Sequence, residues 1–345
     1  MTSFRKLMIK LKSWEYWPWQ LVYLPVGLYS IGHAIKSGSP FYFSASNPAI
    51  KNGGLMSESK SDILAKIPEA YRPLTVLFQA GPTALEEVLN YLREHAIQYP
   101  FILKPDYGER GKGVQKIEDE QALTAYCLEA RLPFIMQPYI DYPLELGVFY
   151  ARFPASPKGT ISSVVIKEML KIKGDGKRSV RTLMESDPRA FLQLARFETE
   201  APYLLEKVPT QGQLIELESI GNHCRGTKFI NGNHLINKQL EVVFDTIALQ
   251  IDGFYYGRFD LRCASLEDLY AGQHIQIMEL NGAKAEPAHI YHPGYSLKQA
   301  YTDLFDHWRV MAEISRENHR RGVPYTPFWK GIKDLGEMIN MNRQS

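Results

Sequence analysis

The sequence predicts a mixed α/β chain in which antiparallel strand pairs alternate with helices. The first observation behind this prediction is size and composition: 345 residues, of which 45% are hydrophobic and 23% charged, can bury a sizeable core in two or three lobes. The second is the alternation of strand-like and helix-like spacing over residues 101–137. The third is another pair of strand-like runs over residues 254–280. An α+β arrangement with antiparallel pairs accounts for all three.

The first part of the chain, residues 1–55, is basic, aromatic and largely apolar. Its basic residues precede a group of aromatic ones: Arg5, Lys6, Lys10 and Lys12, then Trp14, Tyr16, Trp17 and Trp19. Residues 16–35 are mainly apolar over about the length of one membrane span. A signal peptide is disfavoured because no clear small-residue cleavage site follows. Three interpretations stay open: a membrane span, contact with a membrane surface through residues 1–40, and packing on the rest of the chain or on a partner chain.

The remaining elements follow the turn-forming residues 44–54. Helical spacing, or start and stop signals, mark residues 59–67, 84–95, 118–130, 180–185 and 240–250. Strand-like runs occupy residues 101–104, 114–117, 134–137, 147–171 with a break at 157–159, 254–262 and 274–280. Because a glycine-rich turn joins the first two strands, we expect them to form a hairpin.

Charge and cysteine content narrow the functional classes. With 40 basic and 38 acidic residues, a net charge of +2 gives no field that would favour nucleic acid as a partner. The three cysteines, Cys127, Cys224 and Cys263, contain no Cys-x-x-Cys pair. They argue against a disulfide framework or a cysteine-based zinc site, and they predict a reducing, cytoplasmic location. Membrane contact would place the chain peripherally on the inner face of the membrane.

The first candidate site is a glycine-rich turn after an apolar strand. Lys104 ends this strand, and Gly108, Gly111 and Gly113 follow in the turn. Glycines let backbone N–H groups approach phosphate oxygens, and a lysine at the root of the loop can neutralise their charge. The pattern is not a Walker A loop. A solvated hairpin turn is the alternative interpretation.

The second candidate site combines two strands. Arg258 and Asp260 are two apart on one strand, and Glu279 and Asn281 are two apart on the next. Residues two apart share one face, and a hairpin connected through residues 267–271 brings Asp260 opposite Glu279. Two carboxylates and an amide oxygen are ligands that suit Mg²⁺. The alternative is a solvated sheet face that carries an Arg–Asp ion pair.

The third candidate site is the basic loop at residues 221–228. Arg225 offers a bidentate fork and Lys228 a point charge, either of which could hold the γ-phosphate of a nucleotide or a substrate carboxylate. An exposed basic turn is the alternative interpretation. Four residues that follow the second strand pair are candidates for binding an acceptor substrate: Lys284, Glu286, His289 and His292.

In their order along the chain, these residues resemble the ATP-grasp superfamily, and within it the D-alanine–D-alanine ligases and related amino-acid ligases, over about residues 57–295. The resemblance implies that ATP is bound by Lys60, Lys104, Gly108, Gly111, Gly113, Gln137, Tyr139, Ile140 and Glu145, with Gln137 in place of the usual glutamate. It implies Mg²⁺, with Mn²⁺ as a substitute, on Asp260, Glu279 and Asn281. Arg258 is implied to stabilise a tetrahedral intermediate, and the loop residues Arg225 and Lys228 complete the predicted catalytic set.

The resemblance also implies a fold and a reaction. The fold is the ATP-grasp fold, two α+β lobes with the nucleotide between them, preceded by a shortened Trp-rich segment. It divides the chain into residues 1–55, a main domain at 56–330 with a nucleotide-covering lobe at about 98–140, and a tail at 331–345. The reaction is ATP- and Mg²⁺-dependent ligation of a small carboxylate to an amine or another nucleophile through an acyl phosphate. The expected substrate is amino-acid-like. The alternatives are a phosphotransferase and a non-catalytic nucleotide-binding or membrane-associated module, and each is compatible with an oligomer.

Overall fold

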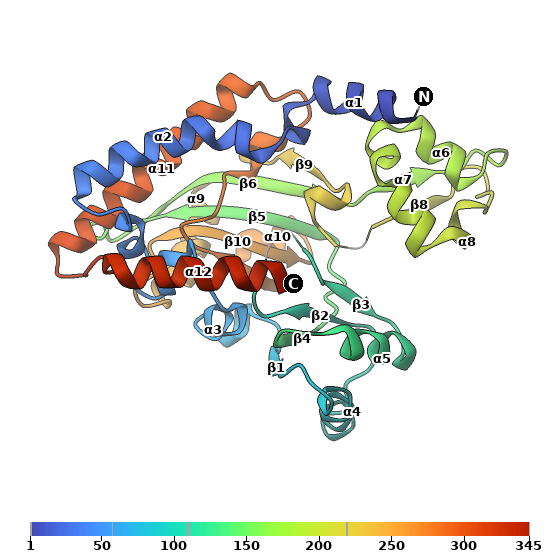
Figure 1. Ribbon diagram of the computed structural model, residues 1–345, viewed down its shortest axis with the longest axis horizontal. Coiled ribbons are helices and arrows are strands. Elements are labelled where there is room, and N and C mark those ends of the chain that lie inside the picture. The colour runs from blue at the N-terminus through green and yellow to red at the C-terminus, as the bar shows by residue number, and fades with distance from the viewer. Residues whose placement is uncertain (1, 57, 109–110, 219, 345) are drawn as a thin grey trace.

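The computed structural model describes residues 2–344 except 57, 109–110 and 219, with the backbone alone for residues 2–3 and 342–344. These residues form three sheets, which divide the molecule into a large central lobe, a smaller lobe below it and a helical lobe at one end (Figure 1). The mixed α/β class predicted from the sequence is confirmed. Short 3₁₀ helices occur between the longer elements: η1 (Trp14–Tyr16), η2 (Tyr42–Ala45), η3 (Lys51–Gly54), η4 (Glu69–Tyr71), η5 (His223–Arg225), η6 (Asn233–Leu235) and η7 (Ala288–Tyr291).

The large lobe contains a five-stranded antiparallel sheet in the spatial order β11, β10, β5, β6, β9. Its strands are β5 (Leu144–Ala151), β6 (Thr160–Glu168), β9 (Lys228–Asn231), β10 (Tyr256–Cys263) and β11 (Ile275–Asn281). Helices α3 (Lys60–Leu64), α9 (Lys238–Leu249) and α10 (Leu266–Ala271) cover one face, where Phe244 and Phe259 are fully buried. Helix α11 (Leu297–Arg320) packs on the other face against Phe149 and Tyr256. Both faces of the sheet are therefore covered, which fixes the strands that carry the candidate site.

The helices of the large lobe begin where the sequence supplies capping side chains. Asn237 accepts a hydrogen bond from the backbone N–H of Leu240 at the start of α9, with an Oδ1···N distance of 2.9 Å. Ser296 and Gln299 form a reciprocal capping box at the start of α11. Such caps satisfy backbone donors that have no partner inside the helix.

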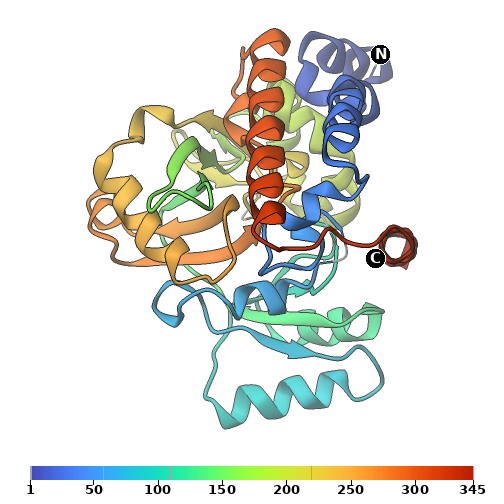
Figure 2. The same ribbon diagram turned by 90° about the vertical axis from the view of Figure 1, so that its left-hand side faces the viewer.

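The small lobe contains a four-stranded antiparallel sheet in the order β1, β4, β2, β3. Its strands are β1 (Val76–Phe78), β2 (Phe101–Pro105), β3 (Gln115–Ile117) and β4 (Phe134–Pro138). Helices α4 (Ala84–Glu94) and α5 (Glu120–Glu129) bury Val88 and Leu123 against the sheet (Figure 2). The predicted hairpin is confirmed, because β2 pairs with β3 through the glycine-rich turn. The lobe begins at β1, ahead of the lower boundary predicted near residue 98.

The helical lobe lies between β6 and β9 in the sequence. It consists of the strand pair β7 (Lys171–Lys173) and β8 (Leu214–Glu216) with helices α6 (Val180–Ser186), α7 (Pro188–Glu200) and α8 (Pro202–Leu205). Met184, Phe191 and Leu205 are buried in a core of its own. The structure thus has a third lobe within the range predicted as one main domain.

The N-terminal segment packs on the rest of the chain. Helix α1 (Thr2–Lys12) contacts α7, where Arg5 lies 4.4 Å above the ring of Phe191. Helix α2 (Trp19–Ser37) lies along α11 (Figure 1). Between them, the Trp14 indole N–H donates to the carbonyl of Tyr295 at 2.7 Å. No helix within the described residues is both long and apolar enough to cross a membrane.

The C-terminal residues form a helix, α12 (Phe328–Gln344). The predicted boundary between residues 330 and 331 falls inside this helix. Gly331 packs against the ring of Phe41, where a side chain would collide with the ring. Asp334 accepts a hydrogen bond from Asn52 at 2.9 Å and pairs with Lys51 at 3.1 Å. The predicted tail is therefore attached to the N-terminal part of the large lobe.

Candidate functional site

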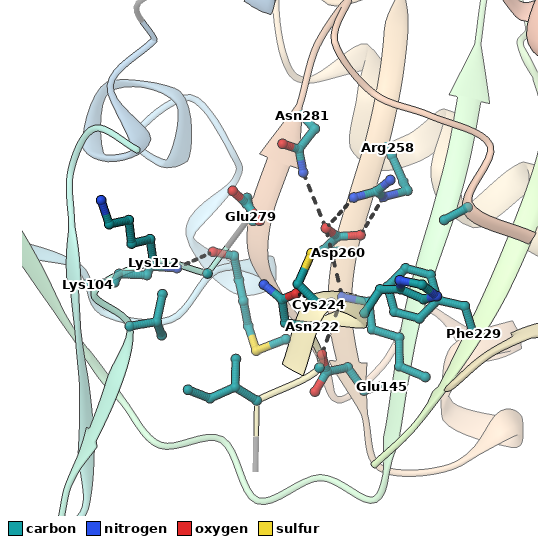
Figure 3. Close-up of a pocket in the computed structure, with 18 of the residues that line it drawn as sticks. Lys104, Lys112, Glu145, Asn222, Cys224, Phe229, Arg258, Asp260, Glu279 and Asn281 are labelled. Carbon is teal, nitrogen blue, oxygen red and sulfur yellow. Dashed lines mark hydrogen bonds and ion pairs between the residues drawn. The ribbon is translucent and has the colours of Figure 1, made fainter. Parts of the chain in front are cut away.

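A cavity of about 630 Å³ lies where the large lobe, the small lobe and the N-terminal segment meet. Its volume is within the range of about 300–1,000 Å³ that is typical of small-molecule sites. Strands β2 and β4 contribute from the small lobe, and β5, β6, β10 and β11 contribute from the large sheet. Most of the residues predicted as a nucleotide and metal site line it (Figure 3). They are Lys60, Lys104, Gly108, Gly111, Gln137, Tyr139, Ile140, Glu145, Arg258, Asp260, Glu279 and Asn281.

The predicted strand register at the acidic end of the cavity is confirmed. Asp260 on β10 lies opposite Glu279 on β11, and Arg258 lies opposite Asn281. The Arg258 guanidinium donates to both carboxylate oxygens of Asp260, with an Nε–Oδ1 distance of 2.7 Å and an Nη2–Oδ2 distance of 2.9 Å. The Asn281 amide nitrogen donates to Asp260 Oδ2 at 3.3 Å. Four polar side chains therefore converge on one sheet surface (Figure 3).

These contacts keep Asp260 ionised. Burial alone would raise the pKa of this carboxyl group, but the charges of Arg258 and Lys167 together hold its pKa below the usual value. Burial likewise opposes the charged form of Arg258, but the Asp260 carboxylate outweighs burial and raises the pKa of the guanidinium. The pair is therefore a fixed negative and positive charge inside the cavity.

Glu279 differs from Asp260 because its carboxylate makes no hydrogen bond or ion pair with any other residue that the structure describes. Burial and the neighbouring Asp260 act to raise its pKa. The ammonium groups of Lys60, Lys104 and Lys284 outweigh them, so that the pKa of Glu279 is lowered. An ionised carboxylate without a hydrogen-bonded partner is available to an added cation.

The donor atoms at this end of the cavity fit a hard cation such as Mg²⁺. Glu279 supplies a carboxylate, and Asn281 uses its nitrogen for Asp260 and leaves its oxygen for a cation. Asp260 would share its carboxylate between the cation and Arg258. The amide oxygen is needed as a third ligand, because no group of three His, Cys, Asp or Glu side chains that could hold a metal exists among the described residues.

Two lysines lie near Glu279, Lys104 on β2 of the small lobe and Lys60 on α3. Lys104 Nζ donates to the Met278 carbonyl at 3.0 Å, and burial lowers the pKa of Lys104 to about 8. Lys60 Nζ donates to three carbonyls of the glycine-rich turn, those of Pro105, Asp106 and Gly108, at 3.1, 3.3 and 2.8 Å. Burial lowers the pKa of Lys60 as well. Lys60 therefore both supports the turn and contributes positive charge to the cavity.

The glycine-rich turn adopts backbone conformations that require glycine. Gly108, Gly111 and Gly113 have φ values of +128°, +69° and +70°. Gly108 and Gly111 line the cavity, whereas Gly113 packs on Pro105 outside it. A side chain at Gly111 would collide with the amide of Asn222, which belongs to the loop before β9. Glu109 and Arg110, within the predicted phosphate loop, lie outside the described residues.

The residues predicted for adenine and ribose line the same cavity, and Glu145 lies near Asp260, since Lys167 pairs with both carboxylates. Gln137 donates its amide N–H to the Thr75 hydroxyl at 2.9 Å. Arg262 donates to the Ile140 carbonyl at 2.6 Å and to Glu145 Oε2 at 2.9 Å. Glu145, on β5, is thus held in place by a cation from β10, and Tyr139 and Ile140 lie in the connection between β4 and β5.

Three charged cavity residues of the small and large lobes were missed by sequence reasoning. Lys112 lies inside the predicted glycine-rich turn and could have been found from its position between two glycines. Arg262 continues the two-residue alternation of Arg258 and Asp260, so the same argument would have placed it on their face. Lys167 on β6 bridges Glu145 at 3.3 Å and Asp260 at 3.9 Å, and no motif in the sequence marks it.

Two residues predicted as catalytic do not line the cavity. Arg225 pairs with Glu218 at 2.7 Å and donates to the Val114 carbonyl at 3.3 Å. Lys228 lies on β9, where its backbone pairs with Glu168. Their neighbours Asn222, His223 and Cys224 line the cavity instead. Arg225 therefore connects the loop to Val114, the residue before β3. Arg258 is the predicted catalytic residue that faces the cavity.

The N-terminal segment forms one wall of the cavity, to which sequence reasoning assigned no site residue. Glu15, Trp17, Pro18, Trp19 and Tyr23 line this wall. The Glu15 carboxylate pairs with Arg189 at 2.9 Å and with His223 at 2.7 Å. Burial opposes its ionisation, but the hydrogen bond from His223 and the charge of Arg189 lower its pKa. The segment is thus joined directly to the loop at residues 220–224.

Comparison of the sequence with protein-family profiles and with curated proteins finds no match. Solved structures similar to this chain include ligases of the kind that the sequence resembles. A D-Ala:D-Ser ligase from Enterococcus faecalis has 16% identity and a TM-score of 0.41 over 72% of this chain and 61% of that one. A D-alanine–D-alanine ligase from Bacillus anthracis has 13% identity and a TM-score of 0.40 over 76% and 69%. D-cycloserine synthetase has 17% identity and a TM-score of 0.40 over 74% and 70%.

The chain therefore spans about 61% of the length of the D-Ala:D-Ser ligase. The likeness is partial, so the functional proposal rests on the geometry of the cavity.

Proposed function

We propose that this chain is an ATP- and Mg²⁺-dependent ligase that joins a small carboxylate to an amine or another nucleophile through an acyl phosphate. One observation carries the proposal: Asp260, Glu279 and Asn281 face Lys60 and Lys104 within one cavity of about 630 Å³. Oxygen ligands for a divalent cation and ammonium groups for phosphates then lie on opposite sides of the same space. This is the arrangement needed to hold the polyphosphate end of a nucleotide.

In this proposal different residues of the cavity bind different parts of ATP. Gln137, Tyr139 and Ile140 bind the adenine, and Glu145 binds the ribose. Lys60, Lys104 and the Gly108–Gly113 turn bind the phosphates. Mg²⁺ or Mn²⁺, held by Asp260, Glu279 and Asn281, supplies charge neutralisation for phosphate oxygens.

Arg258 has a distinct proposed role beside the metal ligands. Its charge is fixed by Asp260, and its third nitrogen, Nη1, donates to the Glu286 carbonyl at 3.1 Å. A guanidinium in that place can orient a substrate carboxylate and stabilise the oxyanion that forms when a nucleophile attacks the acyl phosphate. In the first step a carboxylate oxygen of the substrate bonds to the γ-phosphorus of ATP, and ADP leaves with the electron pair of the broken phosphoanhydride bond. In the second step the nucleophile bonds to the acyl carbon, phosphate leaves with the electron pair of the broken C–O bond, and the nucleophile loses its proton to solvent. The products are the ligated compound, ADP and phosphate.

The decisive variant is Glu279→Gln. It removes one of the two carboxylates while keeping the size of the side chain, so ATP turnover should fall by about 10²-fold or more. ADP formation with Mg²⁺ and pooled amino and hydroxy acids measures this loss, and circular dichroism checks the fold. Glu129→Gln, at the exposed end of α5, is the matched control and should keep full turnover. Mg²⁺-dependent turnover that survives in Glu279→Gln overturns the assignment of the site.

Hydroxylamine in the same reactions separates the alternatives. A ligase that forms an acyl phosphate yields a hydroxamate together with ADP. A phosphotransferase yields ADP and a phosphorylated hydroxy compound without any hydroxamate. A nucleotide-binding module without catalysis binds ATP and releases no ADP above the rate of Glu279→Gln.

The use of ATP supports a cytoplasmic location, which we include in the proposal. We also propose that the substrates are small molecules of amino-acid type. The wall formed by Trp17, Trp19 and Tyr23 lies beside Arg258, Glu286 and Lys284 in the cavity. The second substrate would then bind between an aromatic wall and charged groups.

A further inference from the structure

Helix α2 has two opposite faces, and the rest of the chain covers only one of them. Val22 and Val26 are 5% and 1% exposed, and Tyr29 contacts the ring of Phe305 at 4.9 Å. The outward residues follow a spacing of three or four and are between 56% and 78% exposed: Leu21, Leu24, Leu28, Ile31 and Ile35. Such spacing aligns them in one stripe along the helix. A continuous apolar stripe of this kind on a surface marks a contact with something outside the chain.

Helix α1 extends the apolar surface. Phe4, Leu7 and Leu11 are 69%, 52% and 57% exposed and also follow helical spacing. The two helices follow one another along a single edge of the molecule (Figure 1). We call the outward residues of α1 and α2 the N-terminal face: Phe4, Leu7, Leu11, Leu21, Leu24, Leu28, Ile31 and Ile35.

Almost all charged residues of the segment that carries the N-terminal face are basic. Residues 1–37 contain five basic residues and a single acidic one, although the whole chain has a net charge of only +2. The acidic residue, Glu15, has a side chain that is 10% exposed and is paired with Arg189 and His223. The basic residues are Arg5, Lys6, Lys10, Lys12 and Lys36. Within residues 1–37 the apolar stripe is thus accompanied by five positive charges and one paired acidic residue, a composition that is complementary to an anionic lipid surface.

Two further features favour lipid over a second copy of the chain. Trp17 and Trp19 are partly exposed at the start of α2, and indole rings are favoured at the depth of lipid headgroups. A two-fold symmetric contact through this face would bring the basic residues of two α1 helices towards each other. Like charges in an interface are unfavourable. No described helix can span a membrane, so the segment would lie on the surface.

We propose that α1 and α2 dock this protein on an anionic lipid surface, with both helices lying in the plane of the headgroups. The proposal does not depend on the ligase activity. It has a consequence for the cavity, however, because Trp17, Pro18 and Trp19 line the cavity and directly precede the stripe on α2. The cavity then opens beside the lipid surface.

Co-sedimentation of the full chain with vesicles, without ATP, tests the proposal. Vesicles of phosphatidylcholine with about 30% phosphatidylglycerol should bind the protein at least about tenfold more tightly than pure phosphatidylcholine. Binding should weaken when the ionic strength rises from about 0.05 M to about 0.5 M, because the Debye length shortens. Equal binding to both vesicle types, or no binding to either, overturns the proposal.

Two sets of variants examine the stripe and the charges separately. Leu24→Gln, Leu28→Gln and Ile31→Gln combined should reduce binding to the anionic vesicles at least about tenfold, because three apolar side chains no longer enter the interface. Lys10→Gln and Lys12→Gln should each reduce it about fivefold. The matched control is Leu128→Gln, Val242→Gln and Leu249→Gln combined, exposed apolar residues on α5 and α9, which should leave binding unchanged.

Analytical ultracentrifugation distinguishes the second copy as an occupant. A monomer that binds vesicles supports the proposal. The alternative outcome is a dimer that does not bind vesicles and that dissociates in the triple variant on α2. That outcome assigns the face to a second copy and overturns the proposal. An equal loss of vesicle binding in the control variant also overturns it.

Discussion

Lys104 is a buried cation in a cavity that should receive phosphate charge. It is 8% exposed, and burial lowers its pKa to about 8. Part of the protein therefore carries a neutral Lys104 in mildly alkaline solution. Polyphosphate bound beside it would favour the charged form and raise the pKa again.

The affinity for ATP should consequently fall as the pH rises from about 7 to about 9, because above the pKa of about 8 a proton must be taken up on binding. Isothermal titration calorimetry near pH 8 in two buffers with different ionisation enthalpies measures this proton uptake. Lys104→Gln should bind ATP more weakly and lose most of the uptake. The same affinity and no proton uptake across this range would contradict the role of Lys104.

Single residues differ in how far the sequence could predict them. Asp260 and Glu279 could be paired because a strand repeats every two residues and a short connection fixes the register. Lys167 could not be predicted, because its place between Glu145 and Asp260 depends on β6 lying beside β5. The same holds for Glu15, whose partners Arg189 and His223 come from distant parts of the chain.

At the scale of elements, the β2–β3 turn and the loop at residues 220–224 close on each other. Gly111 has a φ of +69° and faces the side chain of Asn222 so closely that no side chain fits. Arg225 adds a hydrogen bond from the loop to the Val114 carbonyl at 3.3 Å. The position of each loop therefore depends on the other.

Gly111→Ala should weaken ATP binding at least about tenfold by pushing these loops apart, in addition to a backbone cost of about 1 kcal/mol for a left-handed alanine. Fluorescent nucleotide titration measures the affinity, and urea unfolding measures the stability. The control is Gly212→Ala. Gly212 has a φ of +82° and no neighbouring atom within 4 Å of an added Cβ, so this variant should lose stability through the backbone conformation alone.

Asn222→Ala in the Gly111→Ala protein should restore part of the ATP affinity, because it removes the side chain that the new methyl group meets. A Gly111→Ala protein that binds ATP as tightly as Gly212→Ala would show that the contact between the loops is unimportant.

Several elements could be predicted to within a few residues, because their apolar spacing and turn signals are strong, whereas the long helices α7, α11 and α12 were not predicted. Helix α4 and strand β2 are examples. Strand β1 was not predicted, since three residues are too few to show a period. The helical lobe was not separated from the main domain, because its core forms only when β7, β8 and the helices between them come together.

At the scale of the whole molecule, the N-terminal segment is attached to the helical lobe and to the large lobe at once. Glu15 pairs with Arg189 on α7 and with His223 beside the cavity. Its carboxylate has a lowered pKa, so its stabilising contribution is present above the usual value near 4.5 and is lost as the pH falls below it.

Glu15→Gln should lower the free energy of unfolding at neutral pH by on the order of 2–3 kcal/mol, because it leaves the buried Arg189 without its carboxylate. Urea unfolding monitored by circular dichroism gives this value. Glu94→Gln, at the exposed end of α4, serves as the control and should change stability little. The difference between Glu15→Gln and the unsubstituted protein should shrink as the pH falls below about 4.5. Equal stability of all three proteins at pH 7 would contradict this view of Glu15.

Sequence alone left three interpretations of residues 1–55 open because amphipathic spacing does not say what lies against the apolar side. Packing against α11 accounts for Val22 and Val26, while Leu24 and Leu28 stay on the surface. The segment thus satisfies one interpretation with one face and leaves the other face for an external partner.

If both proposed binding events occur, of nucleotide in the cavity and of lipid on α1 and α2, the Glu15 contacts would make them thermodynamically dependent on each other. His223 belongs to a loop that lines the cavity, and Glu15 belongs to the segment between α1 and α2, so a shift on either side changes the same 2.7 Å contact. Linkage is reciprocal: if a lipid surface alters the affinity for nucleotide by some factor, nucleotide alters the affinity for that surface by the same factor. A titration of vesicles with and without a non-hydrolysable ATP analogue would measure this factor, and Glu15→Gln should bring it close to one.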